Sequence, residues 1–453
     1  ENETENVLLK QLGKEYQKAY FGFTLGVGMP DLEADEKFIE KYRKFHSEKN
    51  SGKKDEAESV CGILGEKTIV ARLHDKIMKF PGGQASGCQL VCMNDNAFES
   101  YGKTQSYNSN VSEKAMKKYT AVFNKLISEK NHHCILGDMT LIWFAVKNDD
   151  SKECDIFSSF FGNNNDRKTE DSIASLMRSA RKGVATDDVV TEALINDKDV
   201  TFYIVGFTPN SSRICQKFIY KGSFGDMLGN LVSHQCDLMI NESNSRPIYF
   251  NGIAKELISP KSTNDKVPAP LMSAIMLAAL NNTKYPDALL STVIRRVKTD
   301  NDDDKNHFIK LNDTRAGIIK ACLNRKYKKE EITMAWNDEN KNPAYLCGGL
   351  FAVFEKIQQD ASGGNLNRTI KDSYFASACS RPASVFPKLA KLSQNHMRKL
   401  NDGTAIYYNK MIGDLMSSLN GGFPSTLNLD DQGRFIVGYY QMNKKLYTST
   451  KSE

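Results

Sequence analysis

A proline-rich segment in the second half of the chain separates two different hydrophobic patterns, and this change restricts the folds available. Residues 259–270 hold three prolines among polar residues, a composition typical of an exposed connector. Before it, short runs rich in β-branched and aromatic residues predict strands. After it, apolar residues recur at helical spacing. We therefore predict an α+β N-terminal domain with a mixed or antiparallel sheet, followed by an all-α C-terminal helical bundle.

The same patterns divide the 453 residues into four segments. Residues 1–60 are charged and weakly patterned, and residues 61–258 form the predicted α+β domain. Residues 259–270 form the linker, and residues 271–453 form the helical bundle. A chain of this length can bury a sizeable core in more than one domain.

Two runs in the N-terminal half, 140–146 and 200–207, predict buried strands. Both are rich in β-branched and aromatic residues and are bounded by Gly, Asp or Pro. Residues 208–211 predict a turn, and residues 214–220 predict a partner strand.

Capping residues and prolines mark the expected helices. Residues 111–128 carry apolar side chains on one face, with Ser112 as a possible N-cap. Pro286, Pro343 and Pro382 suit the first turns of three later helices. Two apolar stripes complete the predicted bundle: Val385, Phe386, Leu389, Leu392 and His396, and Met411, Ile412, Leu415, Met416 and Leu419.

The excess positive charge is concentrated toward the C-terminus. Residues 320–453 hold 19 Lys and Arg against 12 Asp and Glu, whereas the rest of the chain holds 42 against 43. A solvated, lysine-rich helical surface is the plain interpretation of this excess. Contact with nucleic acid is the alternative.

Cysteine use and hydropathy indicate an intracellular protein. Ten cysteines at irregular spacing favour reduced thiols over a disulfide framework. The longest apolar run, 271–280, is half as long as the roughly 20 residues that span a bilayer. The first residues carry no signal-peptide pattern. We expect a cytoplasmic location and no membrane partner.

Two constellations could bind a metal, and neither has convincing spacing. Cys88 and Cys92, with the His and Cys residues at 132–134, lack the paired C-x-x-C spacing of a zinc site. The acidic run 302–304 could belong to a nuclease. It lies in a polar stretch between helical patterns, which favours a solvated loop.

A nucleophilic site could combine Cys88 with His74 or His234 as its base, but nothing in the spacing requires it. We therefore predict no catalytic residue, no metal and no cofactor. We also expect no enzymatic activity.

The glycine-rich segment 79–87 is a candidate binding loop. Its small residues would let the backbone approach a phosphate or a duplex groove closely, and Gln84 supplies an amide. A plain surface turn is the alternative. The candidate DNA contacts in this loop are Lys79, Gly82, Gly83, Gln84 and Ser86.

Segment 96–105 brings hydroxyl, aromatic, cationic and amide side chains together. This mixture suits phosphate positioning and base stacking, although a polar helix cap would carry similar residues. The candidates are Ser100, Tyr101, Lys103 and Gln105. Arg213, after a predicted strand and turn, is either a phosphate clamp or the partner of a carboxylate such as Asp226.

A series of short stretches runs in order along the chain: ARLHDKI at 71–77, QASG at 84–87, AFESYGK at 97–103, GDMT at 137–140, FYIVGFTPNSSR at 202–213, NPAY at 342–345, GGLFAVFEK at 348–356 and DQGRFIVGYYQ at 431–441. Together they resemble the large subunit of the type I-C CRISPR effector complex (Cascade), a Csd-type CRISPR-associated protein. The resemblance covers residues 60–447. Residues 1–60 lack it, and because family members carry further N-terminal sequence, it suggests that a leading portion is absent.

The resemblance implies a non-catalytic subunit of an RNA-guided surveillance complex in antiviral defence. In such a complex the guide RNA reads the target by base pairing. The large subunit would sense the protospacer-adjacent motif in double-stranded DNA through residues 61–258 and aid duplex opening and R-loop formation. The helical domain would lie along the displaced strand. Its candidate contacts there are Arg295, Arg296, Lys388, Lys391, Arg398 and Lys399.

The implied partners are the crRNA-containing complex, with its CRISPR backbone and crRNA-end-binding subunits, the target DNA and a helicase-nuclease that the large subunit helps recruit. A small subunit translated from an internal start is also implied. Codons for residues 329–331 could form a ribosome-binding sequence before Met334, although a charged helix end would look the same. The alternative functions are a metal-dependent nuclease and a pure scaffold subunit without DNA sensing.

Overall fold

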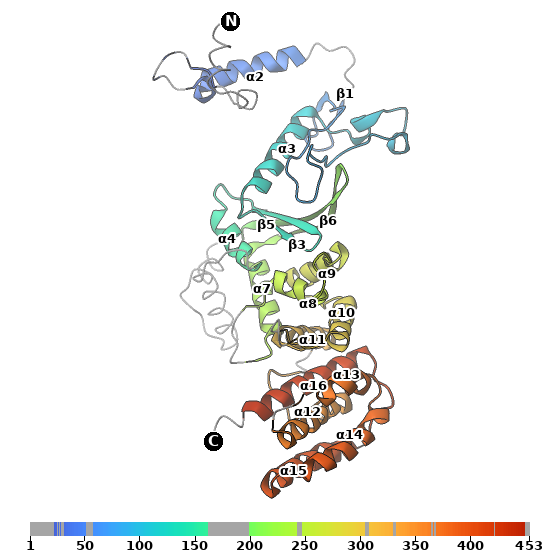
Figure 1. Ribbon diagram of the computed structural model, residues 1–453. Coiled ribbons are helices and arrows are strands. Elements are labelled where there is room, and N and C mark those ends of the chain that lie inside the picture. Colours follow the sequence, from blue (N-terminus) through green and yellow to red (C-terminus); the bar gives the residue numbers. More distant parts are fainter. Residues whose placement is uncertain are drawn as a thin grey trace, which may run out of the picture. The chain divides into compact units, whose positions relative to one another are not determined.

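The computed structural model describes most of the chain (Figure 1). The described residues are 22–24, 26, 28, 31–50, 58–161, 199–241, 247–303, 308–328, 332–363, 366, 368–420 and 422–448. They form two compact units. The first holds the described residues up to Leu73 together with Met93–Met116, and the second holds His74–Cys92 and the described residues from Lys117 onward.

The first unit has little regular structure. Its strands β1 and β2 pair antiparallel, and Ser112 caps the long helix α3 by accepting a hydrogen bond from the Ala115 N–H at 3.1 Å. The N-cap predicted at Ser112 is therefore confirmed. The elements are η2 (Leu32–Ala34), α2 (Glu36–Asn50), β1 (Glu58–Val60), β2 (Lys67–Ile69), η3 (Asn96–Phe98), η4 (Gln105–Ser109) and α3 (Glu113–Ser128), which continues into the second unit.

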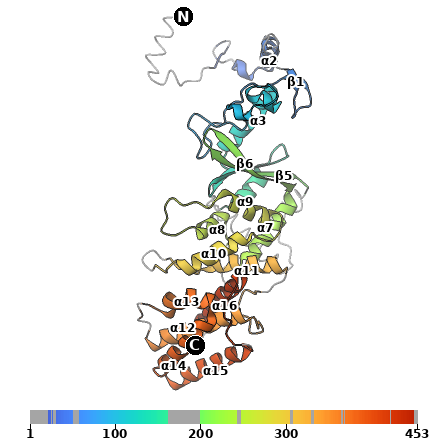
Figure 2. The same cartoon turned by 90° about the vertical axis from the view of Figure 1, so that its right-hand side faces the viewer.

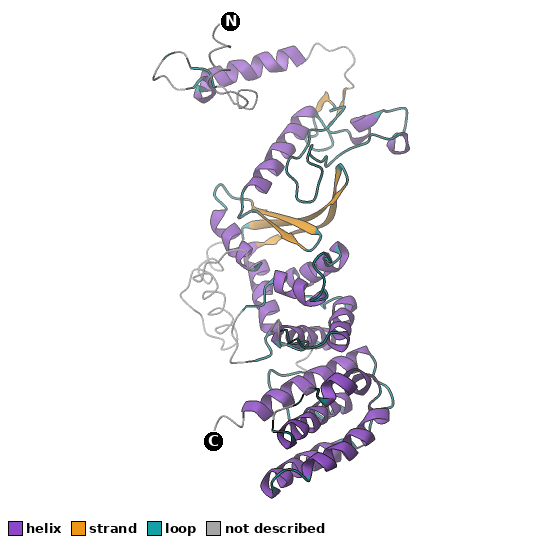
Figure 3. Ribbon diagram, in the orientation of Figure 1, coloured by secondary structure: helices purple, strands orange, loops and turns teal. Residues whose placement is uncertain are grey.

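The second unit begins with a four-stranded antiparallel sheet in the order β3-β4-β5-β6, drawn in orange in Figure 3. Its strands are β3 (His133–Leu136), β4 (Met139–Ala145), β5 (Thr201–Asn210) and β6 (Arg213–Ser223). The strands predicted from the sequence are confirmed, but the predicted turn is wrong. Pro209 pairs with Ile214 inside the hairpin, so the reversal is confined to Ser211 and Ser212, where Ser211 takes a φ of +56°.

Helices make up the rest of the second unit. Figures 1 and 2 show α7–α11 lying between the sheet and α12–α16. The expected fold class, an α+β region followed by a helical bundle, is confirmed. The helices are α4 (Ser151–Ser159), α7 (Phe224–Leu238), α8 (Phe250–Leu257), α9 (Ala269–Leu280), α10 (Asp287–Thr299), α11 (Asp313–Tyr327), α12 (Pro343–Ala361), α13 (Ile370–Ser380), α14 (Pro382–Met397), α15 (Asp402–Ser418) and α16 (Leu429–Thr448).

Buried side chains from the sheet and from helices α4 and α7–α16 form the main core. A second, smaller cluster joins Phe123 and Ile127 of α3 to Ile142, Phe207 and Ile214 of the sheet. Helix α9, which begins within the predicted linker, packs against this sheet: the Ser273 hydroxyl donates to the Met139 sulfur at 3.4 Å. Val267, just before α9, is also buried in the main core. The domain limits at residues 60, 258 and 270 stay predictions.

Helices α12 and α16 approach each other at two glycines. A Cβ atom added to Gly348 would overlap the Phe435 carbonyl oxygen, and one added to Gly438 would overlap the Tyr345 carbonyl oxygen. The two backbones can touch only because these positions carry no side chain. The DQGRFIVGYYQ string at 431–441 is therefore part of a buried helix whose sequence is set by packing.

All ten cysteines lie in the described part of the chain, and each is a free thiol. Among the described residues, no helix combines the length and the apolar character needed to cross a membrane.

Candidate nucleic-acid interface

The 79–87 loop belongs to the second unit, and an antiparallel bridge joins the residues at its two ends. Ile77 and Cys88 pair at its base, with N–H···O distances of 2.7 and 2.9 Å. Two tight turns follow inside the loop, where the Gly83 N–H donates to the Phe80 carbonyl and the Gly87 N–H donates to the Gln84 carbonyl. Because Phe80 is buried, the loop is anchored and its tip is held outward.

Contacts within the chain and backbone conformation explain why glycine occupies these positions of the loop. A Cβ atom on Gly83 would lie 2.5 Å from the Cys88 sulfur, and one on Gly87 would lie 2.9 Å from the Lys76 Cβ. Gly82 takes a φ of +73°, which an L side chain rarely adopts. These positions are therefore explained without a ligand, and the exposed Lys79, Gln84 and Ser86 remain as the loop's candidate DNA contacts.

The loop lies beside the tip of the β5–β6 hairpin. Gln84 Nε2 donates to the Ser211 hydroxyl at 3.3 Å, and the Gln89 N–H donates to the Ser212 carbonyl at 2.8 Å. Arg213 opens β6 at this tip and is half-buried. Of the residues singled out in the sequence, the structure thus brings Gln84 and Arg213 to one region of the second unit.

In the first unit, Ser100, Tyr101, Gly102 and Lys103 form a second candidate, which we name the 100–103 turn. The Lys103 N–H donates to the Ser100 carbonyl at 3.0 Å, and Tyr101 and Gly102 have φ values of +54° and +66°. Two consecutive left-handed residues define a type I′ turn. A tyrosine in this conformation is strained. Its side chain is 98% exposed at the tip.

Asn108, which sequence reasoning missed, holds the 100–103 turn in place. Its Oδ1 accepts from the Ser100 N–H at 3.0 Å, and its Nδ2 donates to the Lys103 carbonyl at 2.8 Å. Gln105 is half-buried and already engaged, because its Oε1 accepts from Arg72 Nη1 at 2.6 Å. Tyr101 is therefore the candidate of this segment that the fold presents most fully.

The candidate displaced-strand cations divide between two helices. On α10, Arg295 is exposed, whereas Arg296 forms an ion pair with Asp300. The others are exposed: Lys388 and Lys391 on α14, Arg398 at its C-cap and Lys399 just after it. Lys388 also lies over the Tyr374 ring, 5.1 Å from its centroid. We therefore regard α14 as the more accessible of the two surfaces.

Comparison with known families decides what kind of protein carries these loops. The family model of the CRISPR-associated protein Cas_Csd1 matches residues 1–447. The chain belongs to the Csd1 family. It is accordingly a CRISPR-associated subunit of the type I-C system, of the large-subunit type. The match begins at residue 1, so it also includes the first 60 residues, where the sequence motifs had suggested no resemblance. A search of curated proteins finds no match.

The metal sites considered from the sequence do not assemble as imagined in this Csd1-family chain. Among the described residues, His132 groups with Asp150 and Cys154. Neither Cys88 nor Cys92 belongs to this group. The Cys154 thiol donates to Asp150 at 3.5 Å, and burial strongly raises the pKa of this thiol. The Cys154 sulfur also lies 3.5 Å from His132 Nδ1, so hydrogen bonds join the three side chains of this cluster.

The acidic run is also held by protein contacts. Asp302 accepts from the Lys310 N–H at 2.7 Å and pairs with Lys371 at 2.6 Å. Burial opposes ionisation of this carboxyl, but the Lys371 ammonium, its hydrogen bond and the contacts with Lys310 together hold the pKa below its usual range. Asp302 is exposed, in keeping with the solvated loop expected from the sequence, and its contacts tie residues before α11 to α13. Residue 304 lies outside the described residues.

The residues considered for a nucleophilic site, Cys88, His74 and His234, each contact a different partner. Cys88 is buried, and its thiol donates to the Ser211 carbonyl at 3.6 Å. His74 bonds to the Tyr119 hydroxyl, and His234 bonds to the Tyr285 hydroxyl. Burial, together with the Arg325 charge, lowers the pKa of His234 to about 3. Each imidazole therefore has a structural partner.

Proposed function

We propose that this Csd1-family chain is a non-catalytic DNA-recognition subunit of the type I-C effector complex. It senses the protospacer-adjacent motif in double-stranded DNA, aids duplex opening and R-loop formation, and helps recruit the helicase-nuclease that degrades the target. Guide pairing supplies sequence specificity in such complexes, so the protein needs only a short motif and a means of separating the strands.

The observation that carries this proposal is the 100–103 turn. Strand separation requires a side chain that can enter the base stack at the first step and hold it open. Tyr101 is an aromatic side chain, almost fully exposed, on a strained backbone that Asn108 fixes by hydrogen bonds. Backbone strain in an exposed turn is common at functional sites. We assign Tyr101 the role of the wedge.

The 79–87 loop is the better candidate for the motif sensor. Gln84 presents a side-chain amide at an anchored tip, and an amide can make paired hydrogen bonds to a base edge. Lys79 and Ser86 are exposed in the same loop and could position a phosphate. Recognition and opening are thus assigned to different side chains, which can be tested separately.

The experiment compares assembled complexes carrying wild-type, Gln84→Ala or Tyr101→Ala subunits on duplexes that differ only in the flanking motif. We expect Gln84→Ala to lower affinity for the correct motif by roughly 1–3 kcal/mol, the value of a paired base contact. Tyr101→Ala should keep motif discrimination. It should instead reduce the fluorescence rise of 2-aminopurine at the first base step, because stacking contributes roughly 1–3 kcal/mol per base.

Two controls accompany these variants. Gln216→Ala removes an exposed glutamine from β6 and should bind like the wild type. Tyr101→Phe keeps the ring and should keep the opening signal. A wild-type complex that binds all flanking motifs equally would support a scaffold instead. Cleavage of DNA by the purified subunit with magnesium or manganese would support a nuclease.

A separate small subunit is the second part of the proposal. Residues 334–448 contain α12–α16, and α12 packs along α16, so a product starting at Met334 would bring both of its longest helices. Residues 329–331, whose codons could form the ribosome-binding sequence, lie outside the described residues. This small subunit would join the large subunit in the crRNA-containing complex.

We expect the native gene with a C-terminal tag to give a short tagged band beside the full-length chain. Met334→Leu should remove the short band and leave the long one, because only the internal start is removed. Met411→Leu, a change at another internal methionine, should leave both bands. Absence of a short band from the wild type would rule out this start.

A further inference from the structure

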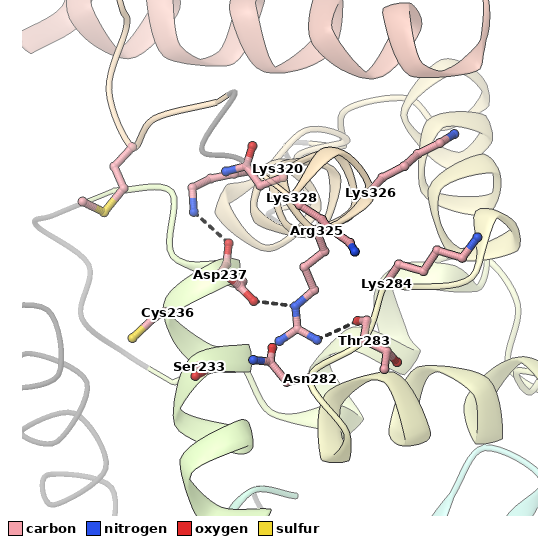
Figure 4. Close-up of a pocket in the computed structure, with 12 residues that line it drawn as sticks. Ser233, Cys236, Asp237, Asn282, Thr283, Lys284, Lys320, Arg325, Lys326 and Lys328 are labelled. Carbon is pink, nitrogen blue, oxygen red and sulfur yellow. Dashed lines mark hydrogen bonds and ion pairs between the residues drawn. The ribbon is translucent and has the colours of Figure 1, made fainter.

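A cavity of about 820 Å³ lies in the second unit, at the C-terminal ends of α7 and α11 and beside the connection between α9 and α10 (Figure 4). Its lining is strongly basic. Among the described residues, five cationic side chains and a single carboxylate, that of Asp237, line it. The cations are Lys284, Lys320, Arg325, Lys326 and Lys328.

Part of this charge is already neutralised. Arg325 Nε donates to Asp237 Oδ2 at 2.6 Å, so the lining carboxylate has its own counter-ion. Lys326 lies 2.9 Å from Asp430 and 3.5 Å from Asp287. Lys284 and Lys328 are both exposed, and neither pairs with a carboxylate within the described part of the chain. The cavity therefore keeps a positive potential after its internal pairs are formed.

Arg325 is rigidly held, yet one of its donors is unsatisfied. Its Nη1 donates to the Ala278 and Thr283 carbonyls at 2.9 and 3.0 Å, and its guanidinium lies 4.5 Å from the centre of the Tyr285 ring. Figure 4 shows this group among Asp237, Asn282 and Thr283. The side chain is 7% exposed, and its Nη2 is buried without an acceptor among the described residues.

An unsatisfied charged donor is unusual, because burial removes water without replacing its hydrogen bond. Nη2 has almost no accessible surface, so an anionic oxygen entering from the cavity would supply the missing acceptor after a small movement of the side chains around Arg325. The planar guanidinium suits phosphate, and the lysines add charge without demanding one geometry. The volume falls within the range of sites that hold a nucleotide-sized ligand.

We propose that this cavity binds a phosphate group, with Arg325 as the buried donor and Lys284 and Lys328 at its entrance. The phosphate belongs either to the backbone of single-stranded nucleic acid or to a free phosphate compound. The first source rests on the proposed function, because the displaced strand would supply it. The second does not.

The main test uses the purified chain with Lys284→Gln/Lys328→Gln. Both lysines are exposed, so the variant should fold normally. The matched control, Lys217→Gln/Lys410→Gln, removes the same charge at two exposed lysines that do not line the cavity. The probes are a fluorescein-labelled oligothymidylate, followed by anisotropy, and AMP and inorganic phosphate, followed by calorimetry.

We expect the cavity variant to bind oligothymidylate about tenfold more weakly than wild type. Its salt dependence should be flatter by about 0.7 for each phosphate that the variant no longer neutralises. The control should stay within about twofold. If the variant instead fails to bind AMP or inorganic phosphate while it still binds oligothymidylate, the site takes free phosphate. Equal behaviour of the cavity variant and the control with every probe overturns the proposal, as does a wild-type chain that binds none of them.

A second variant, Arg325→Lys, tests the buried donor itself. Lysine keeps the charge but lacks the planar fork, so phosphate binding should fall even where the thermal unfolding temperature is close to that of the wild type. Motif discrimination by the assembled complex is measured separately. The cavity variant should retain it, so a failed sensor and a failed phosphate site give different results.

Discussion

We expect Arg315→Met to lower the free energy of unfolding by roughly 3 kcal/mol, because it disrupts a buried ionic cluster. Arg315, on α11, is 1% exposed and lies 2.7 Å from Glu256 and 3.0 Å from Asp300. It also donates to the Lys310 carbonyl at 2.8 Å. The side chain thereby ties α8, the end of α10 and the start of α11 together.

The size of this destabilisation depends on how well the carboxylates that contacted Arg315 remain paired after its removal. Removing one member of a buried pair typically costs roughly 3–5 kcal/mol, because the remaining charge is left uncompensated. Asp300 is 3% exposed but keeps its ion pair with Arg296, and Glu256 keeps a hydrogen bond from Asn312. We therefore place the destabilisation at the lower end of that range.

Urea denaturation followed by circular dichroism measures the change. Arg295→Met, an exposed arginine on α10, is the matched control and should shift stability by less than about 0.5 kcal/mol. A destabilisation below about 1 kcal/mol for Arg315→Met would mean that the methionine packs well enough to replace the ionic cluster.

The second large effect should come from one added methyl group. Gly348→Ala should destabilise the chain by roughly 2–3 kcal/mol, because the new Cβ would overlap the Phe435 carbonyl oxygen and force α12 and α16 apart. The obstacle is backbone, which cannot rotate away as a side chain could. The gain in helix propensity from alanine is smaller than this cost.

The same glycine-to-alanine substitution at another position should raise stability instead of lowering it. Gly413, on α15, is exposed, and a Cβ atom there would meet nothing within 4 Å. Gly413→Ala should therefore raise stability by roughly 0.5–1 kcal/mol through helix propensity alone. Denaturation midpoints of both variants test the pair. Equal shifts would mean that the α12–α16 interface adjusts without strain.

The helices and strands were predictable where local chemistry marks their ends. Pro343 and Pro382 begin α12 and α14, and Asn342 caps α12 by accepting from the Ala344 N–H at 3.0 Å. The turn after β5 was misplaced because Pro209 suggests a reversal locally. Pairing across the hairpin instead carries the strand on to Asn210.

The candidate site was predictable only in part. The composition of 96–105 pointed to Tyr101, but its left-handed backbone and the support from Asn108 depend on contacts that composition does not reveal. The basic cavity was missed because its cations come from α11 and from the α9–α10 connection, which are separated in sequence. The DQGRFIVGYYQ string, in contrast, lies in a buried helix, where Gly438 allows close backbone contact with α12.

The close packing of α12 against α16 also sets an order of events during synthesis. α12 is complete at Ala361, whereas its partner begins at Leu429. At roughly 5–20 residues per second, α12 waits on the order of ten seconds for α16 to be made. Its glycine-lined face is uncovered during that interval. Folding of this bundle therefore lags behind the ribosome, and the nascent chain should depend on chaperones until α16 emerges.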